Sequence, residues 1–127
     1  MMKKSALLLA LLVASGPGFA GWTLVQESHD GIVYVDRDDA EKTTNGWKVD
    51  SSQDFHKVQR HGDHDYLSAK IRYDIDCSAK KLRMLSVELF RENMAGGGTV
   101  HAVTKPGEWM VPDKGSSLEM IWFSLCR

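Results

Sequence analysis

The chain of 127 residues is short of several features that would identify an enzyme or a nucleic-acid-binding protein. It has only two cysteines, Cys77 and Cys126, and they do not form a Cys-x-x-Cys motif. Its formal net charge of −1 gives no reason to expect a nucleic-acid or anionic membrane partner. No zinc-protease motif or serine nucleophile elbow is present, and the run Gly96–Gly98 lacks the Lys-Ser/Thr of a phosphate loop. We therefore expect a protein without catalytic activity and without a cofactor.

Residues 1–20 have the pattern of a cleaved export signal. Two lysines precede the apolar run 6–14, and the small residues Gly18 and Ala20 suit signal peptidase. The run is much shorter than the ~20 residues that cross a bilayer, although a membrane anchor or a buried helix is the alternative. We expect cleavage after Ala20, a single domain over residues 21–127 with no membrane span, and a periplasmic or extracellular location. No cysteine stands directly after the apolar run to carry a lipid.

The segment Leu67–Cys77 alternates between apolar and polar side chains throughout its length. The apolar positions are Leu67, Ala69, Ile71, Tyr73, Ile75 and Cys77, and the polar ones are Ser68, Lys70, Arg72, Asp74 and Asp76. A period of two predicts a β-strand with one face in the core and the other in water. Cys77 should therefore point toward the core.

Five other segments have the composition or alternation of strands. They are Trp22–Gln26, Ile32–Asp36, Trp47–Phe55, Leu82–Phe90 and Thr99–Thr104. Asp30-Gly31 predicts a hairpin turn between the first two strands, and the acidic residues 36–41 are consistent with a short helical turn.

The region around the alternating segment predicts a hairpin and a loop. Leu67–Cys77 and Leu82–Phe90 should form the longest hairpin of the sheet. Within the second strand, one face of the sheet should carry Leu85, Val87 and Leu89, and the other Met84, Ser86 and Glu88. The polar, histidine-rich segment His56–Tyr66 carries Gly62 and is predicted as a long exposed loop.

The C-terminal segment changes to a helical period. Ser116-Ser117-Leu118-Glu119 matches a capping box. Leu118, Ile121, Trp122 and Leu125 then form one apolar stripe, with Cys126 at its border. A strand over residues 120–123 is the alternative, because short apolar runs are ambiguous.

Two cysteines in an exported chain predict a disulfide, with a reactive or metal-binding thiol pair as the alternative. A Cys77–Cys126 bond would fasten the helix to the apolar face of the sheet. The predicted fold is α+β, with a six-stranded antiparallel sheet and one C-terminal helix packed on its apolar face. The other face is expected to meet water, and it carries Lys48, Asp50, Asp54, Lys70, Arg72, Asp74 and Glu88.

The order of several short motifs along residues 21–127 resembles the surface-adhesin protein E family of Gram-negative envelope proteins. The motifs are Trp22-x-Leu-Val, Tyr34-Val-Asp36, Tyr66-x-Ser68-x-Lys70, Asp76-Cys77, Arg83-Met-Leu-Ser86, Met94 with the glycines before Thr99-Val100, Trp109-x-x-Pro112 and Trp122-x-x-x-Cys126. The resemblance implies the same sheet with a disulfide-tied helix. It also implies an adhesin that binds host matrix and serum glycoproteins, although the surface-displayed members carry a lipidated cysteine that this chain lacks.

Two sets of residues are candidate binding sites. His56, His61, Asp63 and His64 are ligand types for zinc or copper, with a solvated loop as the alternative. Lys48, Lys70, Arg72 and Asp74 on the polar face, together with Trp109, are candidates for contact with a protein.

We expect a protein partner in the envelope or outside the cell. One alternative is a periplasmic inhibitor of a lysozyme-like hydrolase that inserts His56–Tyr66 or Met94–Gly98 into a cleft. Another is a metal carrier that uses the histidine segment. A homodimer is also possible, since the first and last strands are candidate exposed edges.

Overall fold

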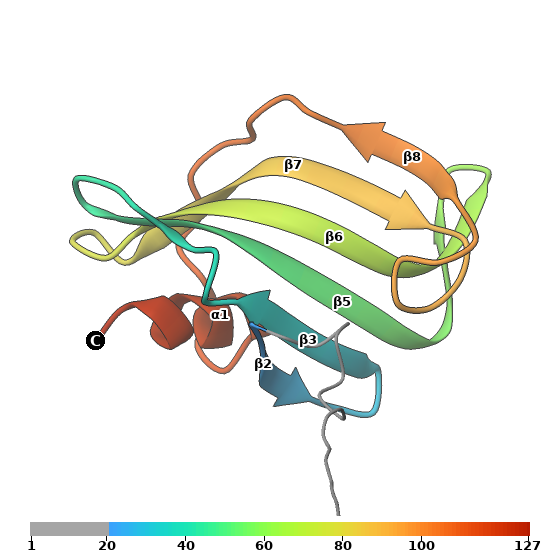
Figure 1. Ribbon diagram of the computed structural model, residues 1–127, viewed down its shortest axis with the longest axis horizontal. Helices are drawn as coiled ribbons and strands as arrows, with labels where there is room; N and C mark the ends of the chain where they lie inside the picture. The colour runs from blue at the N-terminus through green and yellow to red at the C-terminus, as the bar shows by residue number, and fades with distance from the viewer. Residues whose placement is uncertain (1–20) are drawn as a thin grey trace, which may run out of the picture.

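The computed structural model describes residues 21–127 and shows a curved antiparallel sheet with one helix (Figure 1). The strands are β2 (Trp22–Glu27), β3 (Gly31–Asp36), β4 (Glu41–Lys42), β5 (Gly46–His61), β6 (His64–Asp76), β7 (Lys81–Phe90) and β8 (Thr99–Val103), and the helix is α1 (Ser117–Leu125). The predicted signal peptide, residues 1–20, lies outside the described residues. Over residues 21–127, no helix has the length and hydrophobicity of a membrane span.

The sheet confirms the predicted fold class. Its strands lie in the order β2-β3-β5-β6-β7-β8, and all their pairings are antiparallel. The two-residue strand β4 was not predicted and pairs with β5 through Glu41 and Lys48. It occupies the end of the acidic segment that the sequence suggested as a helical turn.

The predicted alternation in β6 matches its burial from Ala69 to Ile75. It fails at the start of the predicted segment, because Ser68, expected on the water face, is buried and Leu67 lies outside the core cluster. Ala69, Ile71, Tyr73 and Ile75 are buried and belong to the hydrophobic core, with Val49 of β5 opposite Tyr73. Burial also raises the pKa of the Tyr73 phenol, because the charged form would lose its hydration. One face of the sheet is therefore the core face, and we call the opposite face the outer face.

The predicted facing of β7 is wrong at two residues, Met84 and Leu85. Between Arg72 and Tyr73 the register with β6 shifts, so that Ser86 lies opposite Arg72 and Met84 lies opposite Tyr73. Leu85 is the extra residue of this β-bulge. A bulge reverses the alternation, and Met84 consequently packs against the core together with Val87, while Leu85 does not belong to the core cluster.

The predicted long loop His56–Tyr66 is also wrong, because these residues extend β5 and β6 into a hairpin. His61 pairs with His64 across the two-residue turn Gly62-Asp63, and Gly62 has a φ of 59°. A positive φ at the first central position is the requirement of a type II′ turn. The longest hairpin is thus β5–β6, with strands of 16 and 13 residues, rather than β6–β7.

Helix α1 begins where the capping box predicts. The Ser116 hydroxyl accepts a hydrogen bond from the Glu119 backbone N–H at 3.2 Å. Ile121 and Trp122 are buried in the core, and the Trp122 indole donates to the Asp76 carbonyl at 2.9 Å. The strand alternative for residues 120–123 is therefore wrong.

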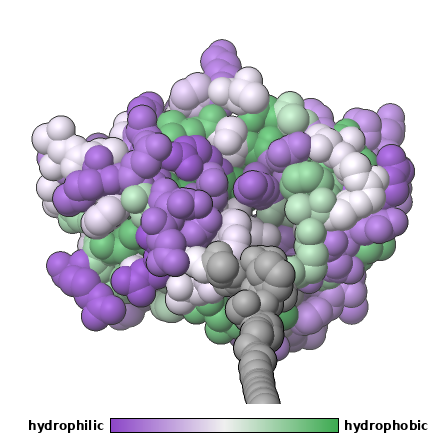
Figure 2. Space-filling view, viewed as in Figure 1, coloured by the Kyte–Doolittle hydropathy of each residue, from purple (hydrophilic) through white to green (hydrophobic). Residues whose placement is uncertain are grey.

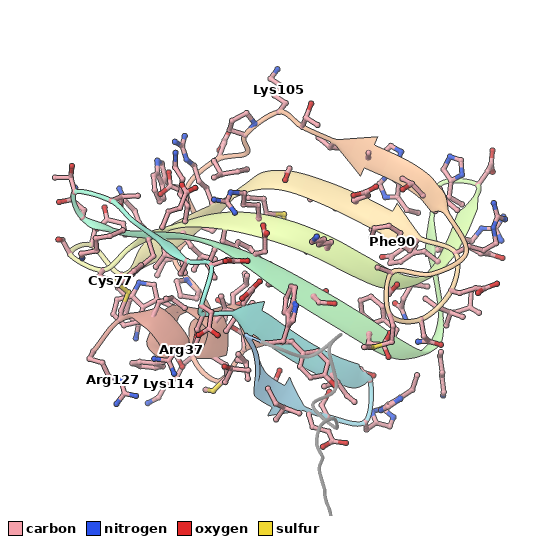
Figure 3. All side chains as sticks on the ribbon, in the orientation of Figure 1. Arg37, Cys77, Phe90, Lys105, Lys114 and Arg127 are labelled. Atoms are coloured by element: carbon pink, nitrogen blue, oxygen red, sulfur yellow. A yellow bond between two sulfur atoms is a disulfide. The ribbon has the colours of Figure 1, made fainter. Side chains whose placement is uncertain are left out.

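A disulfide joins Cys77 to Cys126, with a Cα–Cα distance of 5.4 Å, as predicted. Figure 3 shows Cys77 beside the C-terminal end of α1. The helix contacts β2 and β3, and it therefore covers only part of the core face.

Candidate functional site

Side chains of opposite charge alternate across the outer face of the central strands. In one row Glu41, Lys48, Asp74 and Arg83 are successive cross-strand partners from β4 to β7. In a neighbouring row Asp50 of β5 lies opposite Arg72 of β6, and in the next Lys70 lies opposite Glu88 of β7. Period-two alternation places all of these side chains on one side of the sheet.

Several of these charges form ion pairs within the chain. Arg72 contacts the carboxylate of Asp50 at 3.1 Å and that of Glu41 at 3.4 Å. Arg83 contacts Asp74 at 3.2 Å, and both side chains are largely shielded from solvent. Pairing holds the side chains in defined positions, so a partner would meet a patterned surface of both signs.

Trp109 lies over one end of this face. Its ring is 4.7 Å from the Arg83 guanidinium and 5.4 Å from the Lys81 ammonium, measured to the ring centroid. These cation–π contacts hold the indole in place, yet 39% of the residue stays exposed. The result is a large aromatic side chain that is both fixed and accessible.

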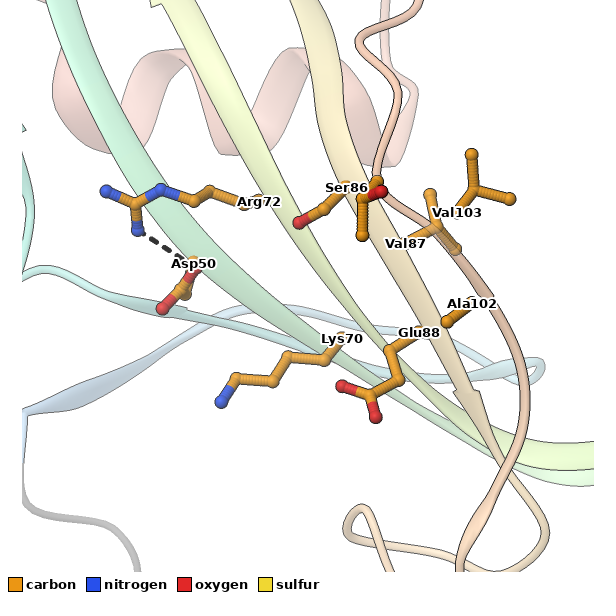
Figure 4. A pocket seen from close by; sticks show the side chains of 9 residues that line it. Asp50, Lys70, Arg72, Ser86, Val87, Glu88, Ala102 and Val103 are labelled. Atoms are coloured by element: carbon orange, nitrogen blue, oxygen red, sulfur yellow. Dashed lines mark hydrogen bonds and ion pairs between the residues drawn. The ribbon is translucent and has the colours of Figure 1, made fainter.

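Two shallow hollows mark the outer face. One of about 260 Å³ is lined by Asp50, Lys70, Arg72 and Glu88, and Figure 4 shows Arg72 reaching to Asp50 while Lys70 and Glu88 lie side by side. A second hollow, of about 290 Å³, is lined by Lys48, Asp74 and Trp109. The five residues proposed from the sequence for partner contact are thus divided between these two hollows.

Figure 2 shows hydrophilic residues over much of the side of the molecule seen in Figure 1, with smaller hydrophobic patches between them.

The segment Met94–Gly98, one of the two segments proposed to enter an enzyme cleft, is held at its start by hydrogen bonds to the strands. The Asn93 side-chain amide donates to the carbonyls of Phe55 and Leu67, at 2.9 and 3.4 Å. The Met94 backbone N–H donates to Asp54 at 2.7 Å. Met94 and Ala95 have φ values of 57° and 61°. Non-glycine residues in this left-handed region cost energy and persist only where the surroundings hold them.

The residues predicted as metal ligands do not form a coordination group. His61, Asp63 and His64 lie at the tip of the β5–β6 hairpin, whereas His56 donates its backbone N–H to Asp30 beside the β2–β3 turn. Within residues 21–127, no group of three or more His, Cys, Asp or Glu side chains is arranged to hold a metal ion. A metal site here therefore stays a prediction from the sequence.

Two features of these surfaces were missed at the level of the sequence. Arg83 and Lys81 contact Trp109. Their spacing of two residues, which matches that of their cross-strand partners Asp74 and Asp76, could have indicated the outer face of β7. His101 of β8 lies 4.7 Å from His61 and 5.8 Å from His64 between ring centroids. No local pattern could have revealed that contact, since it depends on how the hairpin tip bends.

Comparison with known proteins gives one finding that covers the whole described domain. A family model described as surface-adhesin protein E matches residues 22–127. A search of the curated proteins found no match.

Proposed function

Because the chain belongs to the surface-adhesin protein E family, we propose that it is an exported, non-enzymatic domain that binds a protein in the bacterial envelope or outside the cell. The family description supports a role in adhesion, and the outer face of the sheet supplies a surface suited to it. The partner class that the family resemblance implies is a host matrix or serum glycoprotein.

The observation that carries this proposal is the position of Trp109. Tryptophan and arginine are enriched among residues that contribute most to protein–protein affinity. Here an indole with 39% exposure is fixed against Arg83 beside the hollow that contains Lys48 and Asp74. Because the ring is already held, little conformational entropy is lost when a partner covers it.

The charge rows add selectivity. Since Arg72 and Arg83 are paired within the chain, they contribute specificity more than affinity when a partner of matching pattern approaches. A partner with a single sign of charge would meet repulsion from half of each row. This arrangement favours a protein surface over a polyanion.

The test is binding of the exported protein to immobilised host matrix and serum glycoproteins, measured by surface plasmon resonance. Trp109→Ala should weaken binding by roughly tenfold or more. Val111→Ala is the matched control, because Val111 lies two residues away and is 74% exposed. It should change affinity by less than about twofold, as surface substitutions away from a hot spot usually do.

A benzophenone photocrosslinker at Lys70 extends the test to envelope proteins in intact cells, with Lys57 as the control position; both residues are exposed. The proposal is supported if the cross-linker at Lys70 gives an adduct of one defined mass and if Trp109→Ala suppresses that adduct. Equal effects of Trp109→Ala and Val111→Ala, or equal adducts from the two lysines, would contradict it.

The conformation of the segment Met94–Gly98 favours a second candidate function, inhibition of a lysozyme-like hydrolase. Its hydrogen bonds preorganise a protrusion in which Met94 is 49% exposed, and a rigid loop enters an enzyme cleft at low entropic cost. The measurement is lysozyme turnover of a cell-wall suspension with excess protein. Inhibition that Met94→Ala abolishes is the expected result, and unchanged turnover rules out that enzyme as the target.

A further inference from the structure

The core face carries a hydrophobic groove that is separate from the outer face. Its volume is about 410 Å³, within the range of about 300–1,000 Å³ that is common for small-molecule sites. Helix α1 contacts β2 and β3. The groove lies instead over β6, β7 and β8, on the part of the core face beyond the helix.

Hydrophobic side chains form most of the groove. Its floor includes the buried residues Ile71 and Leu89, and its walls include the half-buried Phe55, Tyr66, Met84 and Val87. Half-buried apolar side chains that share one concavity gain free energy when an apolar ligand displaces the water over them.

The bend of the β5–β6 hairpin closes one end of the groove. Between the pairs Asp54–Ser68 and Gln59–Tyr66, β5 contains more residues than β6, and such an excess bends and twists a hairpin. The tip turns toward β8 (Figure 1), where the His101 ring contacts the tilted ring of His61 and stacks on that of His64. The imidazoles of His61 and His101, which line the groove, therefore stand at its end.

The polar residues at the rim are neutral or cationic. They are Gln53, His61, His101 and Lys105, and no acidic residue is among the described residues that line the groove. Figure 3 shows Lys105 extending outward from the segment after β8, so its flexible side chain adds positive charge at the end of the groove away from the hairpin tip. We propose that this groove binds a fatty acid, with its hydrocarbon chain on Ile71 and Val87 and its carboxylate near His61 and His101, where the hairpin tip closes the groove.

A carboxylate with a single alkyl chain fits these observations better than a peptide does. A peptide backbone would bring polar groups over Ile71 and Leu89, where the apolar floor offers them no hydrogen-bonding side chains. An alkyl chain has no such groups, and the imidazoles at the end closed by the hairpin tip supply donors for the carboxylate.

The test is isothermal titration calorimetry of the exported protein with sodium dodecanoate below its micelle-forming concentration. Saturable binding of one equivalent is expected. Val103→Glu places a carboxylate at the groove from a residue that is 41% exposed and lines it, and should weaken binding by roughly tenfold or more. Val111→Glu is the matched control on an exposed valine outside the groove, and should leave the affinity within about twofold.

The charge of the rim is tested separately. His101→Glu should weaken dodecanoate binding by roughly threefold to tenfold, whereas His56→Glu, on an exposed histidine that does not line the groove, should not. Dodecyltrimethylammonium should bind more weakly than dodecanoate. Circular dichroism confirms the fold of each variant, and the comparison of the two amphiphiles on the unmodified protein decides the matter if a variant fails to fold. Absence of saturable binding, equal affinity for the cationic amphiphile, or equal losses from the two valine variants would overturn the proposal.

Discussion

At the scale of single residues, Gly46 shows how closely two strands approach. It begins β5 opposite Asp76, and a Cβ atom at this position would lie 1.9 Å from the backbone carbonyl oxygen of Ile75. The obstacle is backbone within the sheet, so it cannot move aside as the end of a flexible side chain could. The β4–β5 turn and the start of the charge rows depend on this contact.

We predict that Gly46→Ala lowers the free energy of unfolding by about 3 kcal/mol, because the added methyl must displace a strand. Gly115→Ala is the control, since a Cβ atom there meets nothing within 4 Å and only the φ of 81° opposes it. Its cost should be about 1 kcal/mol. Urea denaturation of both variants provides the measurement, and equal losses would contradict the role assigned to the strand contact.

At the scale of elements, α1 is held at its start by Glu119. One carboxylate oxygen accepts from the Gly115 backbone N–H at 2.8 Å and the other from Lys80 at 2.9 Å. These hydrogen bonds, the one from Gly115 first, lower the pKa of Glu119 below its ordinary value of 4.5. The ionised form is therefore favoured in the folded protein, and its contribution to stability is present above pH 4.5 and lost as the pH falls through the lowered pKa.

We predict that Glu119→Gln destabilises the protein at neutral pH and that its difference from the unmodified protein shrinks as the pH falls below 4.5. The measurement is the urea midpoint at a series of pH values. Glu108→Gln, on an exposed glutamate, should give little difference throughout. A difference for Glu119→Gln that does not depend on pH would show that the side chain acts through packing rather than through its charge.

The strands and the helix also show which features the sequence could predict. Alternation in β6 and the Ser116 cap of α1 are local patterns, and they located both elements. The bulge at Leu85 is not local, because it depends on how β7 pairs with β6. The turn Gly62-Asp63 did carry a hairpin signal, but the polar composition around it suggested a loop.

The candidate site was predictable only where it depends on local sequence patterns. Lys48, Lys70, Arg72 and Asp74 share a face by their spacing alone. The place of Trp109 over Arg83 depends on the path of the irregular segment after β8, and the groove depends on the bend that brings His61 to His101. Such contacts between distant segments have no signature in a single sequence.

At the scale of the whole molecule, the disulfide ties the end of α1 to the end of β6 across 49 positions of sequence. A cross-link of that span restricts the unfolded chain, and the chain-entropy model assigns it about 4 kcal/mol. The helix covers β2 and β3, so the bond also secures one side of the core.

We predict that replacing Cys77 and Cys126 together with alanine lowers the free energy of unfolding by about 4 kcal/mol. Urea denaturation checks this value, and the unmodified protein in reducing agent should behave in the same way. A loss below about 1 kcal/mol would mean that packing of Ile121 and Trp122 alone holds the helix.

The two ends of the strand order have a consequence for self-association. Within residues 21–127, β2 and β8 each have one side that pairs with no other strand. Pairing of β2 in one copy with β8 in the next would continue into an open filament, whereas pairing of β2 with β2 or of β8 with β8 would stop at a dimer. Each of these strands carries one additional residue relative to its neighbour, Val25 in β2 and Val100 in β8. Such irregularities twist a border strand away from the flat shape that polymerisation requires, and the fold thereby resists fibre formation while its broad faces stay free for ligands.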